Sequence, residues 1–295
     1  MSANAEPKRK TSLEPVLWSS LLYILGLLFL FYYLHPRVTE FIASNDIAVP
    51  ETSIWPILIY FFSVVIVMGV VLYFIPISKL KMLLRVLFAF LYGWGTFVVL
   101  GLVLPFWIVI SLAVIVGALW FFFPLVWLQN ILLLMTLVAV GTVFGTLVQP
   151  WTVVWVMLAI SAYDVIAVVA GYMMWMAKKL SQSDSLPAFV LPKKAKDWNL
   201  NLKGSTVNKL FDDENAERDF SLLGGGDLGF PLVFVASVIT AYGVNDGIVV
   251  AIASFIGLLF AYFLQIYVLK GKPLPALPPI CFVAFLGFIL VRYII

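Results

Sequence analysis

The sequence of 295 residues is 63% hydrophobic and only 11% charged, with a formal net charge of +3. Ordinary soluble domains carry about 25% charged residues, so a soluble fold cannot hide this much apolar surface and lipid must be the main solvent. At about 20 apolar residues per membrane-spanning helix, the apolar content suffices for about nine helices. The composition excludes soluble enzymes, secreted disulfide-stabilised domains, disordered proteins and nucleic-acid-binding proteins.

Nine apolar segments follow one another along the chain, and we interpret each as a membrane-spanning helix. The first is too long for the apolar core of a signal peptide, which has about 7–15 residues, so we expect it to be retained. The sequence therefore predicts an all-α polytopic membrane protein. The segments cover residues 16–34, 54–75, 83–104, 106–123, 131–148, 151–176, 222–242, 247–269 and 279–295.

The distribution of positive charge predicts the orientation of these helices. If nine segments span the membrane, all 18 Lys and Arg residues except Arg37 and Arg292 fall on the side of the N-terminus. Positive residues concentrate on the cytoplasmic side of membrane proteins. The pattern predicts a cytoplasmic N-terminus and an outside C-terminus, and it would collapse if one span were removed.

A polar segment over residues 177–220 divides the chain. We predict an N-terminal part of six helices over residues 1–176 and a C-terminal part of three helices over residues 221–295. The mixed charges between them are typical of a flexible cytoplasmic loop. Within this loop, the apolar residues 186–191 are compatible with a position on the membrane surface.

Two aspartates stand out, because ionisable residues inside a membrane are costly and tend to mark function. Asp164 lies within the sixth predicted span and Asp227 near the start of the seventh, whereas Asp246 is interpreted as a turn residue beside Gly247. The spacing allows Asp164 and Asp227 to lie at one depth. Two adjacent carboxyls can share one proton, so that one activates water and the other acts as an acid. Taken alone, Asp164 is equally compatible with a protonated side chain that bonds a neighbouring helix.

Two backbone-breaking motifs accompany the aspartates. Gly224, Gly225 and Gly226 precede Asp227, and a proline-rich stretch over residues 273–279 precedes the last span. Such motifs are commonly a flexible entry and a stiff connector. They also let a substrate approach closely and present an extended edge with which a substrate strand can pair.

These motifs, in this order, resemble the presenilin and signal peptide peptidase family of intramembrane aspartyl proteases. The resemblance rests on Tyr-Asp in one span, Gly-x-Gly-Asp in the next and Pro-Ala-Leu before the last. It implies that Asp164 and Asp227 are catalytic and that the fold is presenilin-like. It further implies that the active site is shaped and the substrate bound by the other motif residues. These are Tyr163, Gly224, Gly225 and Gly226, which shape the site, and Pro275, Ala276 and Leu277, which bind substrate.

The resemblance also carries expectations about the setting. The predicted orientation is similar to that of presenilins and opposite to that of signal peptide peptidases. The short chain is most similar to a microbial, archaeal homologue, which implies the cell membrane of a prokaryote. Transmembrane proteins are the expected substrates. The sequence indicates no obligate partner, and it leaves open homo-oligomerisation and self-cleavage of the loop.

Other functions compete with proteolysis. A cation channel or secondary transporter would also use membrane aspartates, and Gly141 with Gly145 is compatible with a helix-packing role. The single histidine, His35, excludes a zinc protease with a His-Glu-x-x-His helix, and the single Cys281 cannot form a thiolate metal site. We therefore expect no metal and no cofactor.

Overall fold

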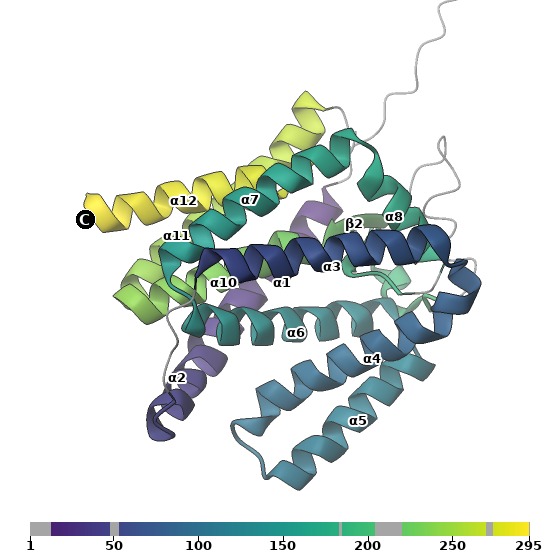
Figure 1. Ribbon diagram of the computed structural model, residues 1–295, viewed down its shortest axis with the longest axis horizontal. Helices are drawn as coiled ribbons and strands as arrows, with labels where there is room; N and C mark the ends of the chain where they lie inside the picture. The colour runs from purple at the N-terminus through teal and green to yellow at the C-terminus, as the bar shows by residue number, and fades with distance from the viewer. Residues whose placement is uncertain (1–12, 48–52, 183–184, 204–219, 270–273, 295) are drawn as a thin grey trace, which may run out of the picture.

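The computed structural model describes residues 13–47, 53–182, 185–203, 220–269 and 274–294. Helices dominate this part of the chain (Figure 1). Part of the predicted loop, residues 204–219, and the basic residues near the N-terminus lie outside the described residues. The elements before the polar segment are helices: α1 (Glu14–Phe29), η1 (Leu30–Leu34), α2 (His35–Ser44), α3 (Ile54–Phe74), α4 (Ile77–Gly101), α5 (Phe106–Phe122), α6 (Val126–Leu147) and α7 (Pro150–Val169).

The second half of the chain mixes helices with two short strands. Two elements of the chain are π-helical turns that continue the α-helix before them: η1 in the first half and η3 in the second. The elements are α8 (Tyr172–Ser181), β1 (Ala188–Pro192), η2 (Ala195–Asn199), β2 (Phe220–Gly224), α10 (Gly225–Tyr242), α11 (Val244–Phe263), η3 (Leu264–Val268) and α12 (Leu277–Tyr293).

Each of the nine apolar segments corresponds to a helix in the described part of the chain. Seven helical stretches there are long and apolar enough to cross a membrane, among them the continuous stretch Glu14–Ser44. The apolar helices Phe106–Phe122 and Leu277–Tyr293 are shorter. The chain is thus a mostly helical, multi-pass membrane protein, while the count of nine spans and the orientation stay predictions.

The sixth predicted span ends earlier than expected. Gly171 adopts a left-handed backbone with φ of 71° and separates α7 from α8. Glycine carries no Cβ and accepts this conformation at low cost, which makes it a common helix terminator. The apolar run up to residue 176 is therefore two helices, because hydropathy does not register a single change in backbone direction.

The prediction of a flexible loop over residues 177–220 is wrong for its described central part, and the all-α prediction misses a small sheet. Strand β1 pairs with β2 in an antiparallel sheet in which Phe189 faces Leu223 across the two strands. Phe189, Val190 and Leu191 are fully buried. Leu186 and the three residues Phe189, Val190 and Leu191 thus belong to the protein core and do not lie on the membrane surface, whereas Pro187 is exposed.

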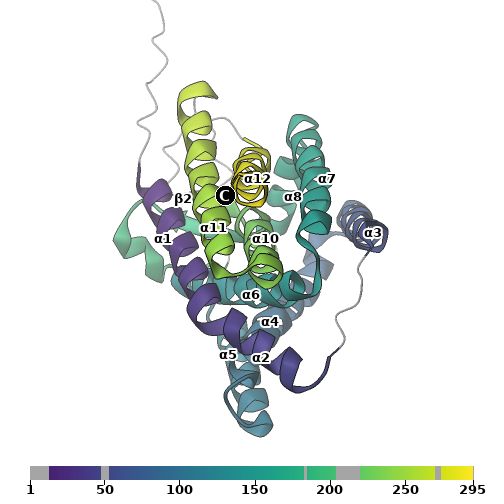
Figure 2. The same ribbon diagram turned by 90° about the vertical axis from the view of Figure 1, so that its left-hand side faces the viewer.

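Helix α6 runs through the middle of the fold, with α4 and α5 on one side and α7 and α12 on the other (Figure 1). Helix α10 packs along α6, α11 and α12, as Figure 2 shows in an end-on view. Gly141 and Gly145 let α6 approach α10, since a Cβ at Gly145 would lie 2.6 Å from the carbonyl oxygen of Val233. Both glycines therefore serve internal packing.

Helix α3 lies at the periphery and packs mainly against α7 and α8 (Figure 2). Only 6% of its most apolar 18-residue stretch is buried within the protein. Its side chains therefore require lipid as their main neighbour.

Candidate active site

Asp164 lies within α7 with 5% of its surface exposed. Its Oδ2 accepts a hydrogen bond of 3.3 Å from the backbone N–H of Leu277. Leu277 is the first residue of α12, where backbone N–H groups lack a partner within the helix. The positive end of the helix dipole thus faces the carboxyl group and offsets part of the cost of its burial.

The sequence at the start of α12 explains why this contact is available. Pro278 and Pro279 follow Leu277 and have no N–H. The next residue, Ile280, bonds back to the carbonyl of Ala276 at 3.5 Å. The N–H of Leu277 is therefore the one donor that the first turn of α12 leaves unpaired within the helix, and it points at Asp164.

Asp227 lies in the first turn of α10, directly after strand β2. The backbone of Gly224 donates a hydrogen bond to its carboxyl group. A Cβ at Gly224 would lie 3.0 Å from Oδ2 of Asp227, so glycine leaves room for the carboxyl group. Pro231 lies four residues on and lacks the N–H that would bond the backbone carbonyl of Asp227.

Asp164 and Asp227 lie near the same segment before α12, although 63 positions separate them in the sequence (227 − 164). Their charges interact, and both also act on the buried Cys281 of α12. Residues 276 and 277 connect the pair, because Ala276 lines the cavity beside Asp227 and Leu277 bonds Asp164. Two carboxyls near enough for their charges to interact can hold one proton between them.

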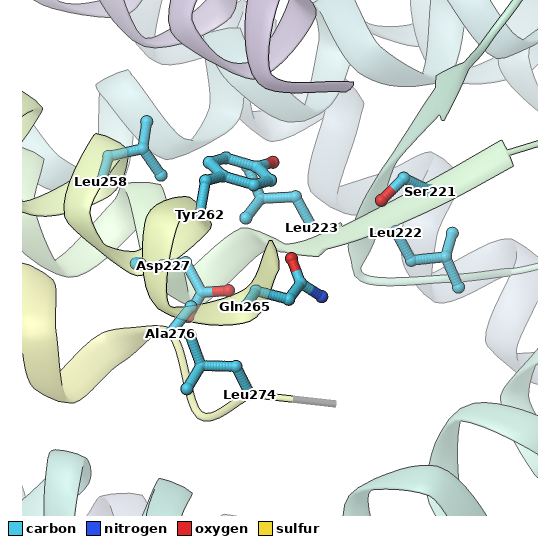
Figure 3. A pocket seen from close by; sticks show the side chains of 10 residues that line it. Ser221, Leu222, Leu223, Asp227, Leu258, Tyr262, Gln265, Leu274 and Ala276 are labelled. Carbon is cyan, nitrogen blue, oxygen red and sulfur yellow. The ribbon is translucent and has the colours of Figure 1, made fainter. Parts of the chain in front are cut away.

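A cavity of about 70 Å³ opens beside Asp227 (Figure 3). One wall comes from strand β2 and the opposite wall from α11, η3 and the segment before α12. The volume is of the order of one aliphatic side chain. Its lining residues are Ser221, Leu222, Leu223, Asp227, Leu258, Ala261, Tyr262, Gln265, Leu274 and Ala276.

The two outer edges of the small sheet differ in whether their backbone groups are already hydrogen-bonded. Asn130 of α6 is fully buried and pairs with the outer edge of β1: its Nδ2 donates to the carbonyl of Val190 at 2.7 Å, and its Oδ1 accepts from the N–H of Val190 at 2.9 Å. Val190 thus points both backbone groups away from β2. Leu222 is the residue of β2 opposite Val190. In an antiparallel pair whose two residues do not bond each other, the N–H and C=O of both residues point away from the partner strand. The N–H and C=O of Leu222 therefore face away from β1.

The sequence model of the family described as "Signal-peptide peptidase, presenilin aspartyl protease" matches residues 21–294. The chain belongs to this family.

Two solved structures of a presenilin family intramembrane aspartate protease, in the C222 and P2 space groups, share the fold of this presenilin-family chain. Both are 20% identical in sequence, with TM-scores of 0.60 and 0.57. Each match covers 94% of this chain and 98% or 96% of the solved chain. No curated protein sequence matches the chain.

The motif residues of this presenilin-family chain occupy different positions around the carboxyl pair. Tyr163 faces the periphery, where its ring packs edge-on against Phe61 and Phe62 of α3. Gly225 is buried and donates to the carbonyl of Pro187 at 3.0 Å, so it joins α10 to the start of β1.

The remaining motif residues lie closer to the cavity. Gly226 is exposed, and a Cβ there would meet only the ring of Phe230 at 3.4 Å. Pro275 lies between the lining residues Leu274 and Ala276. Asp246, interpreted above as a turn residue, lies instead in the first turn of α11, after Gly243 has made the turn with φ of 105°.

The wall formed by α11 and η3 is absent from the sequence-based site. Leu258, Ala261 and Tyr262 give no signal, because apolar residues in an apolar span look alike. Gln265 does give one, since it places a carboxamide inside a predicted span, but a search restricted to ionisable groups passes over it. No group of three or more His, Cys, Asp or Glu side chains in the described ranges is arranged to hold a metal ion.

Proposed function

We propose that this protein is an intramembrane aspartyl endopeptidase that hydrolyses peptide bonds in transmembrane helices of other proteins. The observation that carries the proposal is the interaction of Asp164 with Asp227 beside a cavity inside a membrane-spanning fold. Membership of an aspartyl protease family supports it. The residues around the pair would shape the site (Tyr163, Gly224, Gly225, Gly226) and bind substrate (Pro275, Ala276, Leu277).

The chemistry follows from one proton shared by two carboxyls. The ionised carboxylate takes a proton from water as the water oxygen attacks the scissile carbonyl carbon, and the protonated carboxyl donates to the carbonyl oxygen. The tetrahedral intermediate then collapses. One of its two hydroxyls returns a proton to the ionised carboxylate while the nitrogen takes a proton from the other carboxyl, the C–N bond breaks, and the products are an amine and a carboxylic acid, with the pair again holding one proton.

A helical substrate must unwind before this step, because its peptide groups are inaccessible within a helix. Each backbone group freed in lipid without a partner costs several kcal/mol. The outward N–H and C=O of Leu222 offer partners along the cavity wall, and addition of a strand to a free sheet edge is a common mode of peptide binding. We therefore expect the substrate to bind as an extended strand beside β2.

We keep the remaining predictions as part of this proposal. The chain crosses the membrane nine times, with the N-terminus in the cytoplasm and the C-terminus outside, in the cell membrane of a prokaryote. It acts without an obligate partner. Residues 1–176 and 221–295 contribute one catalytic aspartate each.

The test is cleavage of a single-span substrate by the full chain in liposomes, with products identified by mass spectrometry. Asp164→Asn and Asp227→Asn each preserve shape and remove the acid, so we expect each to abolish cleavage. Asp246→Asn, also in the first turn of a helix, is the matched control and should retain it. Cleavage that persists in either Asp164→Asn or Asp227→Asn overturns the proposal.

The same liposomes test the cation channel or transporter. Cation flux that requires both aspartates, in a preparation without any cleavage, would replace the protease with a transport function. The cavity favours the protease, because the strand edge offers both an N–H and a C=O, the pair that a peptide main chain requires, whereas a cation would use only the carbonyl oxygen.

A further inference from the structure

The sheet beside the active site is closed on one side by a single amide side chain. Asn130 uses both ends of its carboxamide on the N–H and C=O of Val190, at 2.9 and 2.7 Å. A carboxamide has the same donor and acceptor as a peptide group, so one side chain replaces one residue of a missing strand. The fold thus ends the sheet at β1 without another strand.

A second carboxamide lies on the other side of the sheet, across the cavity. Gln265 belongs to the π-helical turn η3 and lines the cavity opposite Leu222. Figure 3 shows its carboxamide between the carboxyl group of Asp227 and strand β2. Within the described ranges this carboxamide makes no hydrogen bond. The neighbouring wall residues Leu258 and Ala261 are apolar and offer no side-chain partner.

The placement of Gln265 follows from the helix geometry. The turn from Leu264 to Val268 is π-helical, and such turns are rare and frequent at functional sites. Ala261 and Leu258, one and two turns earlier, face the same cavity, so Gln265 lies at the end of the helix face that forms this wall. Gln265 is only partly buried, and its amide can donate to and accept from a polar group that enters the cavity.

An extended substrate that pairs with Leu222 on one edge would have unpaired backbone groups on its other edge. Its outward N–H and C=O groups would point across the cavity, away from β2, toward η3 and residues 274–276. The groups on this edge would need hydrogen-bond partners, as the outer edge of β1 does, where Asn130 bonds the N–H and C=O of Val190.

We propose that Gln265 is a substrate-binding residue that hydrogen-bonds the main chain of the unwound substrate on the edge opposite β2. The order across the site is then Asn130, β1, β2, substrate and Gln265. The ligand class is an extended peptide main chain, recognised through its N–H and C=O groups and therefore with tolerance for side-chain identity. This inference rests on the proposed proteolytic function.

The first test compares Gln265→Met with the unaltered protein. Methionine is unbranched and similar in length, so the variant keeps the packing of η3 and removes the hydrogen bonds that Gln265 would make to the substrate main chain. We expect kcat/KM for a single-span substrate to fall about tenfold, mainly through KM, as for loss of one good hydrogen bond. Gln149→Met, an exposed glutamine at the start of α7, is the matched control and should leave both constants unchanged.

The second test locates the bond on the substrate. Ester bonds replace the peptide bonds one at a time around the cleavage site, which removes one N–H in each substrate. One position should lose affinity in the unaltered protein and lose little more in Gln265→Met. Binding to the inactive Asp227→Asn background gives the same comparison without turnover.

The outcomes separate the two proposals. Unchanged KM and unchanged binding in a folded Gln265→Met variant overturn the role of Gln265 and leave the protease intact. Ester penalties that are identical in both proteins at every position do the same. Absence of cleavage by the unaltered protein, with ester penalties that still depend on Gln265, would instead overturn the proteolytic function and keep a peptide-binding site.

Discussion

The backbone N–H of Leu277 lies 3.3 Å from Oδ2 of Asp164 and connects the start of α12 to the C-terminal third of α7. Asp164 therefore has a structural role in addition to its proposed chemical one. We expect Asp164→Ala to lower the free energy of unfolding by about 1–3 kcal/mol, because it leaves a buried N–H without a partner. Asp164→Asn keeps an oxygen in place and should cost much less.

Thermal unfolding in detergent measures this difference, with hydrogen exchange over α12 as a local readout. Asp227 accepts its backbone bond from Gly224, within its own segment, and not from α12, so Asp227→Ala serves as the comparison. Equal stability of Asp164→Ala and Asp164→Asn would show that the Leu277 contact contributes nothing to the fold.

The shared proton predicts how activity depends on pH. At low pH the ionised carboxylate that takes the proton from water becomes protonated, and kcat/KM falls. At high pH the protonated carboxyl loses its proton and kcat/KM falls again. The profile should be bell-shaped, and its two limbs belong to the pair as a whole.

The measurement is the initial rate of cleavage at low substrate across the pH range, in liposomes of one fixed composition. Asp246→Asn should reproduce the bell, because Asp246 lies at the start of α11 and takes no part in the pair. A rate that stays level from acid to alkaline pH would contradict the shared proton.

Gly224→Ala tests the space beside the second carboxyl group. The backbone at Gly224 has φ of −58°, which any residue adopts, so the substitution causes no backbone strain. The added Cβ would lie 3.0 Å from Oδ2 of Asp227 and push the carboxyl group out of position. We expect at least about a tenfold loss of kcat, since small displacements of catalytic groups are costly.

Cleavage kinetics and thermal unfolding together check this prediction, because activity should fall with little change in stability. Gly101→Ala is the control, as its Cβ would meet a single methyl group at 3.9 Å. Full activity of Gly224→Ala would mean that Asp227 does not need this space.

The sequence predicts the helices well and makes Asp164 and Asp227 the candidate site residues, because both inferences depend on properties that the bilayer imposes. Long apolar segments must be helical in lipid, and charges inside them are rare enough to be conspicuous. The spacing of Asp164 and Asp227 along their spans also predicts that they lie near each other. The contact of Leu277 with Asp164 depends on a backbone N–H, which no side-chain pattern reveals.

The sheet and the far wall of the cavity could not be predicted in the same way. Strand β1 owes its burial to α6 and α1, which pack around it from distant parts of the sequence. Its five residues lie within a segment of polar composition, which favours a loop. Gly171 and Gln265 are single residues whose effect depends on neighbours that hydropathy does not identify.

Asn130 provides the sharpest test of the sheet. Asn130→Leu keeps the approximate volume but leaves the buried N–H and C=O of Val190 unpaired, and each unsatisfied group costs about 1–3 kcal/mol. We expect a clear loss of stability and faster hydrogen exchange at β1. If β2 aligns the substrate, the loosened sheet should also spread cleavage over neighbouring peptide bonds, which mass spectrometry of the products detects.

The control comes from the same helix. Thr142 is also fully buried on α6, but its hydroxyl bonds the carbonyl of Val138 within the helix at 2.8 Å. Thr142→Val therefore removes a local bond and no contact with the sheet, and it should keep a single cleavage pattern. A product pattern in Asn130→Leu that matches that of Thr142→Val, with β1 demonstrably loosened, would mean that something other than the sheet sets the register of cleavage.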